Sequence, residues 1–231
     1  SAIAGGTNSY THYQGLLELR QAIAGKMRRY NNVVVDPEEE IVVSAGATGA
    51  FYCACLALLD KGDEVILFEP YYGYHFNTLQ TLGIKTPLVA LQAPDWRFTA
   101  SDLEKAVSAR TKAIVVCTPA NPCGKVFSRS ELEIIAGFAS AHGLFIITDE
   151  IYEYFLYDHN SHISPASLAE SRDRTITISG YSKTFNITGW RIGYCTAERR
   201  LADIIGQLND LVYVCAPAPL QRGVAAGINQ L

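Results

Sequence analysis

A lysine and an arginine stand eight residues apart in a segment rich in small and hydroxyl side chains, 179–193. Lys183 follows an apolar run, residues 175–178, that is typical of a β-strand. A lysine among small side chains at a strand end can be desolvated enough to act as a nucleophile. The Arg191 guanidinium stays charged, and its forked shape suits a phosphate group. Each residue alone fits a surface charge, and it is the rest of the chain that favours covalent chemistry on a phosphorylated molecule.

A second segment predicts an anion-binding turn. The apolar run 40–44 leads into Ala45-Gly-Ala-Thr-Gly49 and then into a helix of small residues that ends near Leu59. The free N–H groups and the dipole at a helix N-terminus attract anions, so this turn has the geometry of a phosphate cradle. The turn is neither a G-x-G-x-x-G nor a P-loop, and a simple strand-to-helix connector would explain it as well.

Polar and aromatic side chains follow the ends of three more predicted strands, at 65–68, 112–118 and 144–148. In a parallel sheet such ends lie at one edge, where ligands bind. An aromatic ring there can be a stacking surface or part of the core, and a carboxylate can be a ligand or a helix cap. The residues in question are Tyr72, Asn121, Asp149 and Tyr152.

Short apolar strands alternating with helices predict an α/β fold, a three-layer α/β/α arrangement around a mostly parallel sheet. Capping-box patterns start two of the helices, at Ser101–Glu104 and Ser128–Glu131. The first helix begins at Gly15, with Arg20 and Lys26 on faces away from its apolar stripe; Arg20, Arg199, Arg200 and Arg222 are interpreted as surface charges. We expect an irregular arm over residues 1–14 and one domain over residues 15–231.

Composition excludes several classes of protein. The 231 residues are 48% hydrophobic and 18% charged, with a net charge of −4, which is typical of a globular protein and not of a nucleic-acid binder. No apolar run reaches the ~18 residues of a membrane span. The six cysteines form no C-x-x-C pair and lie apart from the histidines, which predicts free thiols, no metal site and a cytoplasmic location.

These candidate residues supply a lysine, an anion cradle, an aromatic plate, a carboxylate and two neutral hydrogen-bonding groups. That set suits pyridoxal 5'-phosphate, a planar, phosphorylated aldehyde with a basic ring nitrogen. A carboxylate stabilises the protonated ring nitrogen, and the lysine amine, once displaced by a substrate, can carry the α-proton.

The chain resembles the class I/II aminotransferases among the fold-type I pyridoxal-phosphate enzymes. The resemblance runs from Tyr10 to about Gly193 and combines six motifs in family order. These are Tyr10–Arg20, Gly46–Thr48, Pro70–Tyr72, Thr118–Gly124, Asp149–Tyr152, and Ser182-Lys183 through Gly189–Gly193.

The resemblance implies a role for each matching residue. Lys183 forms the Schiff base with the cofactor and moves the proton, and Asp149 pairs with the ring nitrogen. Tyr152 and Asn121 contact the ring hydroxyl, Tyr72 stacks on the ring, and the Asn121–Pro122 bond can be cis. The phosphate ligands are the Ala47 main chain, Thr48, Arg191 and either Ser182 or Ser179, because Gly180 replaces the usual serine. Tyr10 would reach the neighbouring site of a homodimer.

We therefore expect an aminotransferase that moves an amino group between an L-amino acid and a 2-oxo acid. Family members continue into a small C-terminal domain that carries the arginine for the substrate carboxylate, and this domain and an N-terminal segment are expected to be absent here. Two alternatives remain: another reaction on the same cofactor, such as C–S β-elimination or a cyclising elimination, and a non-catalytic cofactor-binding fragment. A nucleotide-binding dehydrogenase is disfavoured because the sequence has no G-x-G-x-x-G.

Overall fold

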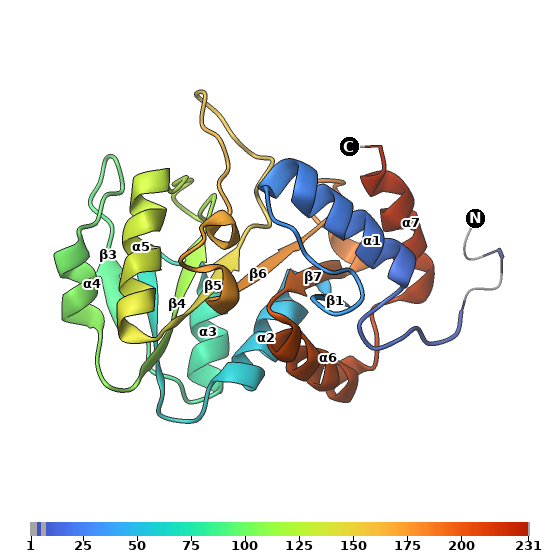
Figure 1. Cartoon of the computed structure of the whole chain (residues 1–231), viewed down its shortest axis with the longest axis horizontal. Helices are drawn as coiled ribbons and strands as arrows, with labels where there is room; N and C mark the ends of the chain where they lie inside the picture. The colour runs from blue at the N-terminus through green and yellow to red at the C-terminus, as the bar shows by residue number, and fades with distance from the viewer. Residues whose placement is uncertain (1–3, 6–7, 231) are drawn as a thin grey trace. The chain divides into compact units, whose positions relative to one another are not determined.

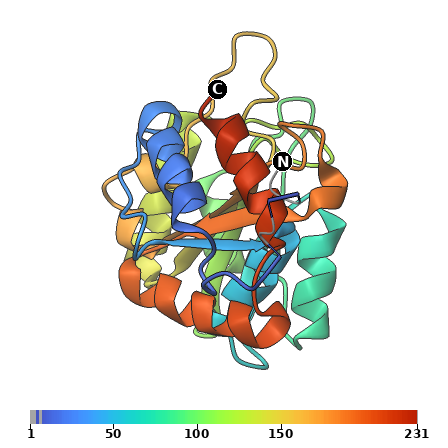
Figure 2. The same ribbon diagram turned by 90° about the vertical axis from the view of Figure 1, so that its right-hand side faces the viewer.

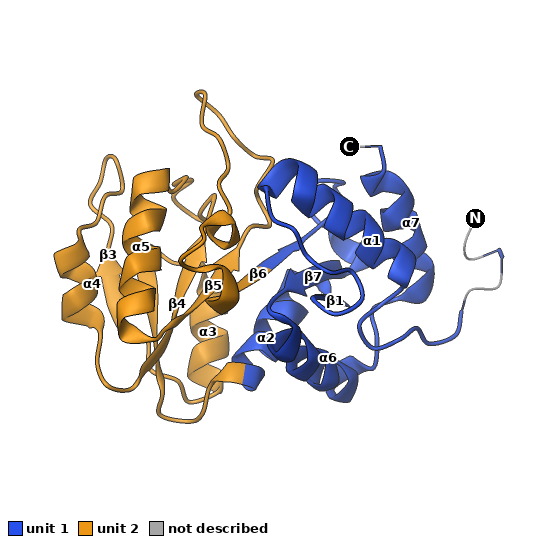
Figure 3. Ribbon diagram, viewed as in Figure 1, with its two compact units in different colours: residues 1–57, 178–231 blue, residues 58–177 orange. Residues whose placement is uncertain are grey.

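The computed structural model describes residues 4–5 and 8–230, and the chain divides into two compact units (Figure 3). The first unit comprises Ser1–Ala57 and Ile178–Leu231, and the second comprises Leu58–Thr177. Part of the predicted arm, 1–14, lies outside the described residues, and so does residue 231.

The second unit is built on parallel strands with helices between them (Figure 1). Its strands pair in the order β5, β4, β2, β3, and each of these pairs is parallel. Strands β2, β4 and β5 are almost continuously apolar, as expected where both faces of a sheet are covered. The elements are β2 (Glu64–Glu69), α3 (Gly73–Thr81), β3 (Leu88–Ala90), α4 (Ala100–Ala106), β4 (Thr111–Cys117), α5 (Arg129–His142) and β5 (Phe145–Asp149).

Helices cover both faces of this part of the sheet. Neighbouring residues of a strand point to opposite faces. Ile66 belongs to a core cluster with Leu103 of α4 and Leu132 of α5. Leu67, the next residue of β2, lines a pocket with His75 of α3. The predicted α/β/α layering is confirmed within this unit.

The first unit contains an antiparallel pair, β1 and β7, in which Ala45 lies opposite Ile192. Helix α1 packs against α7, and the two lie side by side in Figure 2. No helix in the described part of the chain is long and apolar enough to cross a membrane. The elements are α1 (Leu17–Lys26), a π-helical turn (Met27–Asn31), β1 (Ile41–Ala45), α2 (Gly46–Leu58), β7 (Ile192–Thr196), α6 (Arg199–Tyr213) and α7 (Ala218–Ile228).

Strand β6 (Thr175–Gly180) belongs to both units, because the division falls between Thr177 and Ile178. Every residue of β6 is buried. It is the neighbour of β7 in the first unit and of β5 in the second. The sheet is therefore mixed, with mostly parallel pairs in agreement with the predicted fold class.

Two basic residues of the first helix are buried: Arg20, which was predicted as a surface charge, and Lys26, which was predicted on a face away from the apolar stripe. Arg20 is 7% exposed and donates from one terminal nitrogen to the carbonyls of Pro37 and Glu38. Lys26 is 2% exposed and donates to the Asn31 side chain at 2.9 Å. The surface prediction was wrong because polar groups outside the helix satisfy these cations, and helical periodicity carries no information about them.

The two predicted capping boxes had different outcomes. Ser128 caps α5 as predicted, since its hydroxyl accepts from the Glu131 N–H while its own N–H donates to the Glu131 carboxylate at 2.8 Å. Helix α4 instead begins at Ala100, and both the N–H and the hydroxyl of Thr99 donate to Asp102. The Ser101–Glu104 prediction was wrong by two residues because Thr99 and Asp102 have the same capping spacing.

All six cysteines are free thiols, and three of them are buried in the first unit. Cys53 and Cys55 lie on α2, and Cys195 lies on β7. Burial raises the pKa of Cys53 to about 11 and that of Cys195 to about 12.

Replacing Ser128 by alanine removes the hydroxyl that caps α5. We expect Ser128→Ala to lower the free energy of unfolding by about 1 kcal/mol, because one N–H of the first turn loses its acceptor. Urea titration followed by circular dichroism measures the change. Ser140→Ala, on the exposed surface of the same helix, is the matched control. Equal stability of the two variants would contradict the assigned cap.

Candidate functional site

The predicted site residues fall into two groups, one in each unit, and each group is described by itself. The first unit holds Tyr10, Ala47, Thr48, Ser182, Lys183 and Arg191, and the second holds Tyr72, Asn121, Asp149 and Tyr152.

The first unit has a positive charge at the start of a helix. Helix α2 begins at Gly46, directly after β1, so Ala47 and Thr48 lie in its first turn. The Arg191 guanidinium donates to the carbonyls of Thr188 at 2.9 Å and Ala45 at 3.4 Å. A Cβ atom on Gly46 would lie 2.7 Å from the guanidinium carbon, so this group covers the helix start. Among the described residues no carboxylate pairs with Arg191, so its charge and the helix N–H groups make the start of α2 a candidate anion site.

This site requires a close approach of two main-chain segments. Gly193 of β7 lies against Gly46, and a Cβ atom on Gly193 would be 2.9 Å from the Gly46 Cα and closer still to the Ala47 nitrogen. Only glycine fits at such a distance. The absence of a side chain at Gly193 therefore lets the first turn of α2 lie directly on β7.

Lys183 lies in a turn that follows β6. The N–H of Phe185 donates to the Tyr181 carbonyl at 3.1 Å, and the N–H of Ile187 donates to the Ser182 carbonyl at 3.1 Å. The Tyr181 N–H donates to the carbonyl of Ile192, the first residue of β7, at 3.3 Å. The turn is thus attached to the strand that follows Arg191, with Ser182 buried and Lys183 half-buried.

Tyr10, the remaining predicted site residue of the first unit, is 81% exposed.

The second unit holds a buried carboxylate. Asp149 ends β5 and is 5% exposed. Its Oδ2 lies 2.9 Å from Nε2 of His75, which is itself buried on α3. Its Oδ1 accepts from the Ile151 N–H at 3.1 Å. Both carboxylate oxygens are therefore held in fixed directions.

Two other predicted residues of this unit lie near that carboxylate. The Tyr72 ring meets the His75 ring edge-on, with centroids 5.2 Å apart. Burial raises the pKa of Tyr72, and the nearby Tyr74, Asp149 and Tyr152 raise it further. Tyr72, His75 and Asn121 line one pocket of about 20 Å³, enough for a water molecule. The Asn121–Pro122 bond is cis, as the resemblance allowed.

His75 is a site residue that the sequence did not indicate. It follows Tyr72 by three residues in the first turn of α3, which places both side chains near the end of β2. The sequence shows the three-residue spacing from Tyr72 to His75. No local pattern connects His75 with Asp149, which lies 74 positions away in the sequence.

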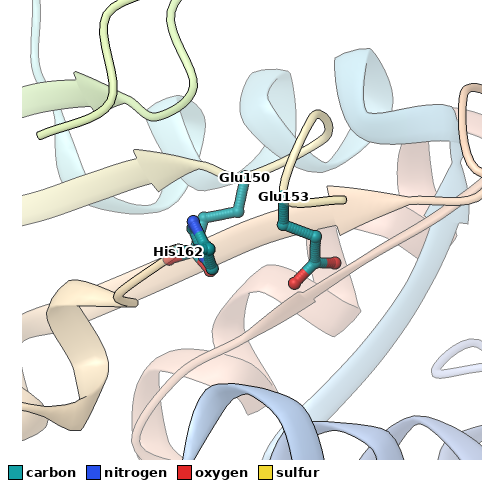
Figure 4. Close-up of side chains that lie close together, drawn as sticks. All are labelled: Glu150, Glu153 and His162. Atoms are coloured by element: carbon teal, nitrogen blue, oxygen red, sulfur yellow. The ribbon is translucent and has the colours of Figure 1, made fainter. Parts of the chain in front are cut away.

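The side chains of Glu150, Glu153 and His162 lie close together on another part of the second unit (Figure 4). Their possible ligand atoms lie within 4.8 Å of one another, a spacing that could hold a metal ion. Glu150 accepts from the Ser164 hydroxyl at 2.7 Å and lies 2.8 Å from the His162 ring nitrogen. These contacts already use both Glu150 oxygens, and they attach the residue after Asp149 to the loop at 162–164.

Comparison with known proteins gives a consistent result. A protein-family model described as aminotransferase class I and II matches residues 1–230. A probable N-succinyldiaminopimelate aminotransferase of Mycobacterium tuberculosis is 41% identical over 99% of this chain and 58% of its own length. An aspartate aminotransferase of Pyrococcus abyssi is 41% identical over 81% of this chain and 49% of its own.

Solved structures agree in fold. The structure of N-succinyldiaminopimelate aminotransferase from M. tuberculosis matches 99% of this chain with a TM-score of 0.96 at 38% identity, and the match covers 60% of that protein. An aromatic aminotransferase from Pyrococcus horikoshii matches with a TM-score of 0.95 at 36% identity. The chain thus spans somewhat more than half the length of most of the relatives compared here.

The buried His75–Asp149 pair predicts a large effect on stability. His75→Leu removes one partner of a buried carboxylate, and we expect a loss of about 1–3 kcal/mol in the free energy of unfolding. The exposed His142–Glu104 pair offers a matched control. His142→Leu is expected to cost about 0.5 kcal/mol or less. Urea titration of both variants checks this, and equal losses would show that the His75 contact does not hold Asp149.

The close approach at Gly193 predicts a loss of anion binding. Gly193→Ala places a methyl group against the start of α2, and we expect about 1–3 kcal/mol of destabilisation from overpacking. We also expect inorganic phosphate to stop raising the melting temperature, because the first turn of α2 is displaced. Gly189→Ala, where a Cβ meets no atom within 4 Å, is the control. An undiminished response of Gly193→Ala to phosphate would refute the assigned cradle.

Proposed function

The chain belongs to the family of class I and II aminotransferases. On this basis we propose that the protein moves an amino group between an L-amino acid and a 2-oxo acid, with pyridoxal 5'-phosphate as cofactor. The observation that carries the proposal is the anion site of the first unit, in a chain whose compared relatives are named aminotransferases. The names of the relatives include N-succinyldiaminopimelate, aspartate and methionine aminotransferases, so we leave the amino acid unassigned.

The anion site fits a phosphate group. The Arg191 guanidinium contacts two main-chain carbonyls and keeps its charge available beside the first turn of α2. In the proposal, the Ala47 N–H, the Thr48 hydroxyl and Arg191 bind the phosphate, together with the hydroxyl of Ser182 or Ser179. Both serines are buried, so burial does not choose between them.

The acidic site of the second unit fits a protonated ring nitrogen. Asp149 is buried and both its oxygens are oriented, as a carboxylate must be to hold a cationic N–H. In the proposal, Asp149 holds the ring nitrogen, Tyr72 stacks on the ring, and Asn121 and Tyr152 donate to its hydroxyl. When bound, pyridoxal phosphate supplies an aldehyde and an electron-poor ring that stabilises negative charge on a substrate carbon.

Lys183 is the catalytic residue of the proposal. Its Nζ would hold the cofactor through the aldehyde and, once free, would accept the α-proton of the substrate and deliver it to another carbon. The turn that contains Lys183 is attached to β7 through the Tyr181 N–H, which restricts where the amine can lie.

Further proposals concern the assembly and location of the protein. We propose a homodimer in which Tyr10 binds the phosphate of the neighbouring subunit, and the 81% exposure of Tyr10 supports this. We also propose that residues 15–231 form the cofactor-binding domain, with 1–14 as an arm. A cytoplasmic location is proposed from the free thiols.

Loss of the Lys183 amine tests the proposal directly. Wild type with pyridoxal phosphate should show a new absorption band, and borohydride should fix the cofactor to Lys183, as read by peptide mass. Lys183→Ala should lose the band and reduce amino transfer by about 100-fold or more, whereas Lys112→Ala, an exposed lysine, should behave as wild type.

The product identifies the reaction. Amino transfer from an amino acid to a 2-oxo acid is the expected outcome. Pyruvate and ammonia released from a cysteine thioether without amino transfer would identify a β-lyase, and cofactor binding without turnover would identify a binding domain.

A further inference from the structure

Two polar side chains of α6 reach the start of α2 in the first unit. Asn209 and Tyr213 are one helical turn apart and therefore lie on the same face of α6. The Ala45 N–H donates to the Tyr213 oxygen at 3.1 Å, and the Tyr213 hydroxyl donates to Oδ1 of Asn209. Asn209 is fully buried, and its amide nitrogen donates to the carbonyl of Tyr13 at 2.9 Å.

The hydrogen bonds around Tyr213 connect α6 with β1. The Tyr213 hydroxyl accepts from the Ala45 N–H and donates to Asn209, and it also has a hydrogen-bonding contact with the Cys53 thiol. The Asn209 amide nitrogen faces main-chain carbonyls. The second of those carbonyls belongs to Val43 of β1, at 3.5 Å. Burial raises the pKa of the Tyr213 hydroxyl, which at neutral pH is protonated even at its ordinary pKa and can therefore donate. Such chains of hydrogen bonds strengthen one another in a buried setting.

These hydrogen bonds lead from α6 to Ala45, the last residue before the proposed anion site. Ala45 closes β1, and α2 begins at Gly46. The Ala45 N–H is held by Tyr213, and the Ala45 carbonyl is held by Arg191. A Cβ atom on Gly49 would lie 3.0 Å from the Tyr213 oxygen, so the first turn of α2 also packs on this hydroxyl. The direction of the helix N–H groups therefore depends on Tyr213.

The end of α6 is held in an unfavourable conformation. Val214, directly after Tyr213, has φ +67°, a left-handed value that β-branched residues rarely adopt. Such strain persists only where the surrounding structure determines the position, and it concentrates at functional sites.

We propose that Tyr213, oriented by Asn209, is a positioning residue for the anion site at the N-terminus of α2. It acts through the main chain of Ala45 and does not touch the anion. That the anion is the cofactor phosphate rests on the proposed function.

The test separates the phosphate group from the rest of the cofactor. Tyr213→Phe keeps the ring and removes the hydroxyl, and Tyr157→Phe, at an exposed tyrosine, is the control. The probes are inorganic phosphate, pyridoxal phosphate and pyridoxal, which lacks the phosphate. We expect Tyr213→Phe to bind inorganic phosphate and pyridoxal phosphate roughly five- to tenfold more weakly, as the loss of one hydrogen bond implies. Pyridoxal binding should not change.

A second variant guards against a simple folding defect. Gly49→Ala keeps the Tyr213 hydroxyl but places a methyl group against it, and it should produce the same phosphate-specific loss. Unchanged phosphate binding in both variants, or an equal loss for pyridoxal and pyridoxal phosphate, overturns the inference. So does a wild type that binds no inorganic phosphate. If phosphate binding responds as expected but borohydride fixes nothing to Lys183, the proposed function fails and the positioning role stands.

Discussion

The anion site depends on one contact between main-chain segments, that of Gly193 on β7 with Gly46 and Ala47 at the start of α2. The contact leaves no room for a side chain, so it sets the distance between the strand and the helix. The antiparallel register places Ile192 opposite Ala45, and Arg191, the residue before, reaches the Ala45 carbonyl from this position. The pairing of β1 with β7, the start of α2 and the position of the Arg191 guanidinium thus all depend on contacts within residues 45–47 and 191–193.

The second unit contains two adjacent buried carboxylates, those of Asp149 and Glu150. Asp149 and Glu150 leave the end of β5 toward different partners, because neighbouring residues of an extended chain point in opposite directions. Asp149 contacts His75, and Glu150 contacts Ser164 and His162. Each carboxylate therefore has its own hydrogen-bonding partners.

Local chemistry was predictable from the sequence, and distant contacts were not. The residues of β7 and the Ser128 cap follow from residue types within a few positions of each other. Tyr213 bonds to a residue 168 positions away, so no local pattern could connect it with the anion site. The six motifs predicted the candidate site residues, but the groups that contact these residues from distant parts of the chain came only from the structure.

The buried cysteines of the first unit allow the opening of α2 to be measured by thiol labelling. Cys53 and Cys55 lie on α2, the helix whose first turn belongs to the proposed anion site, and Cys195 lies on β7. Alkylating reagents attack the thiolate, and burial both blocks access and raises the pKa of these thiols. Modification of Cys53 therefore requires α2 to separate from the residues packed against it. The rate of thiol labelling measures how often this helix opens, and an anion that binds the closed form slows that rate.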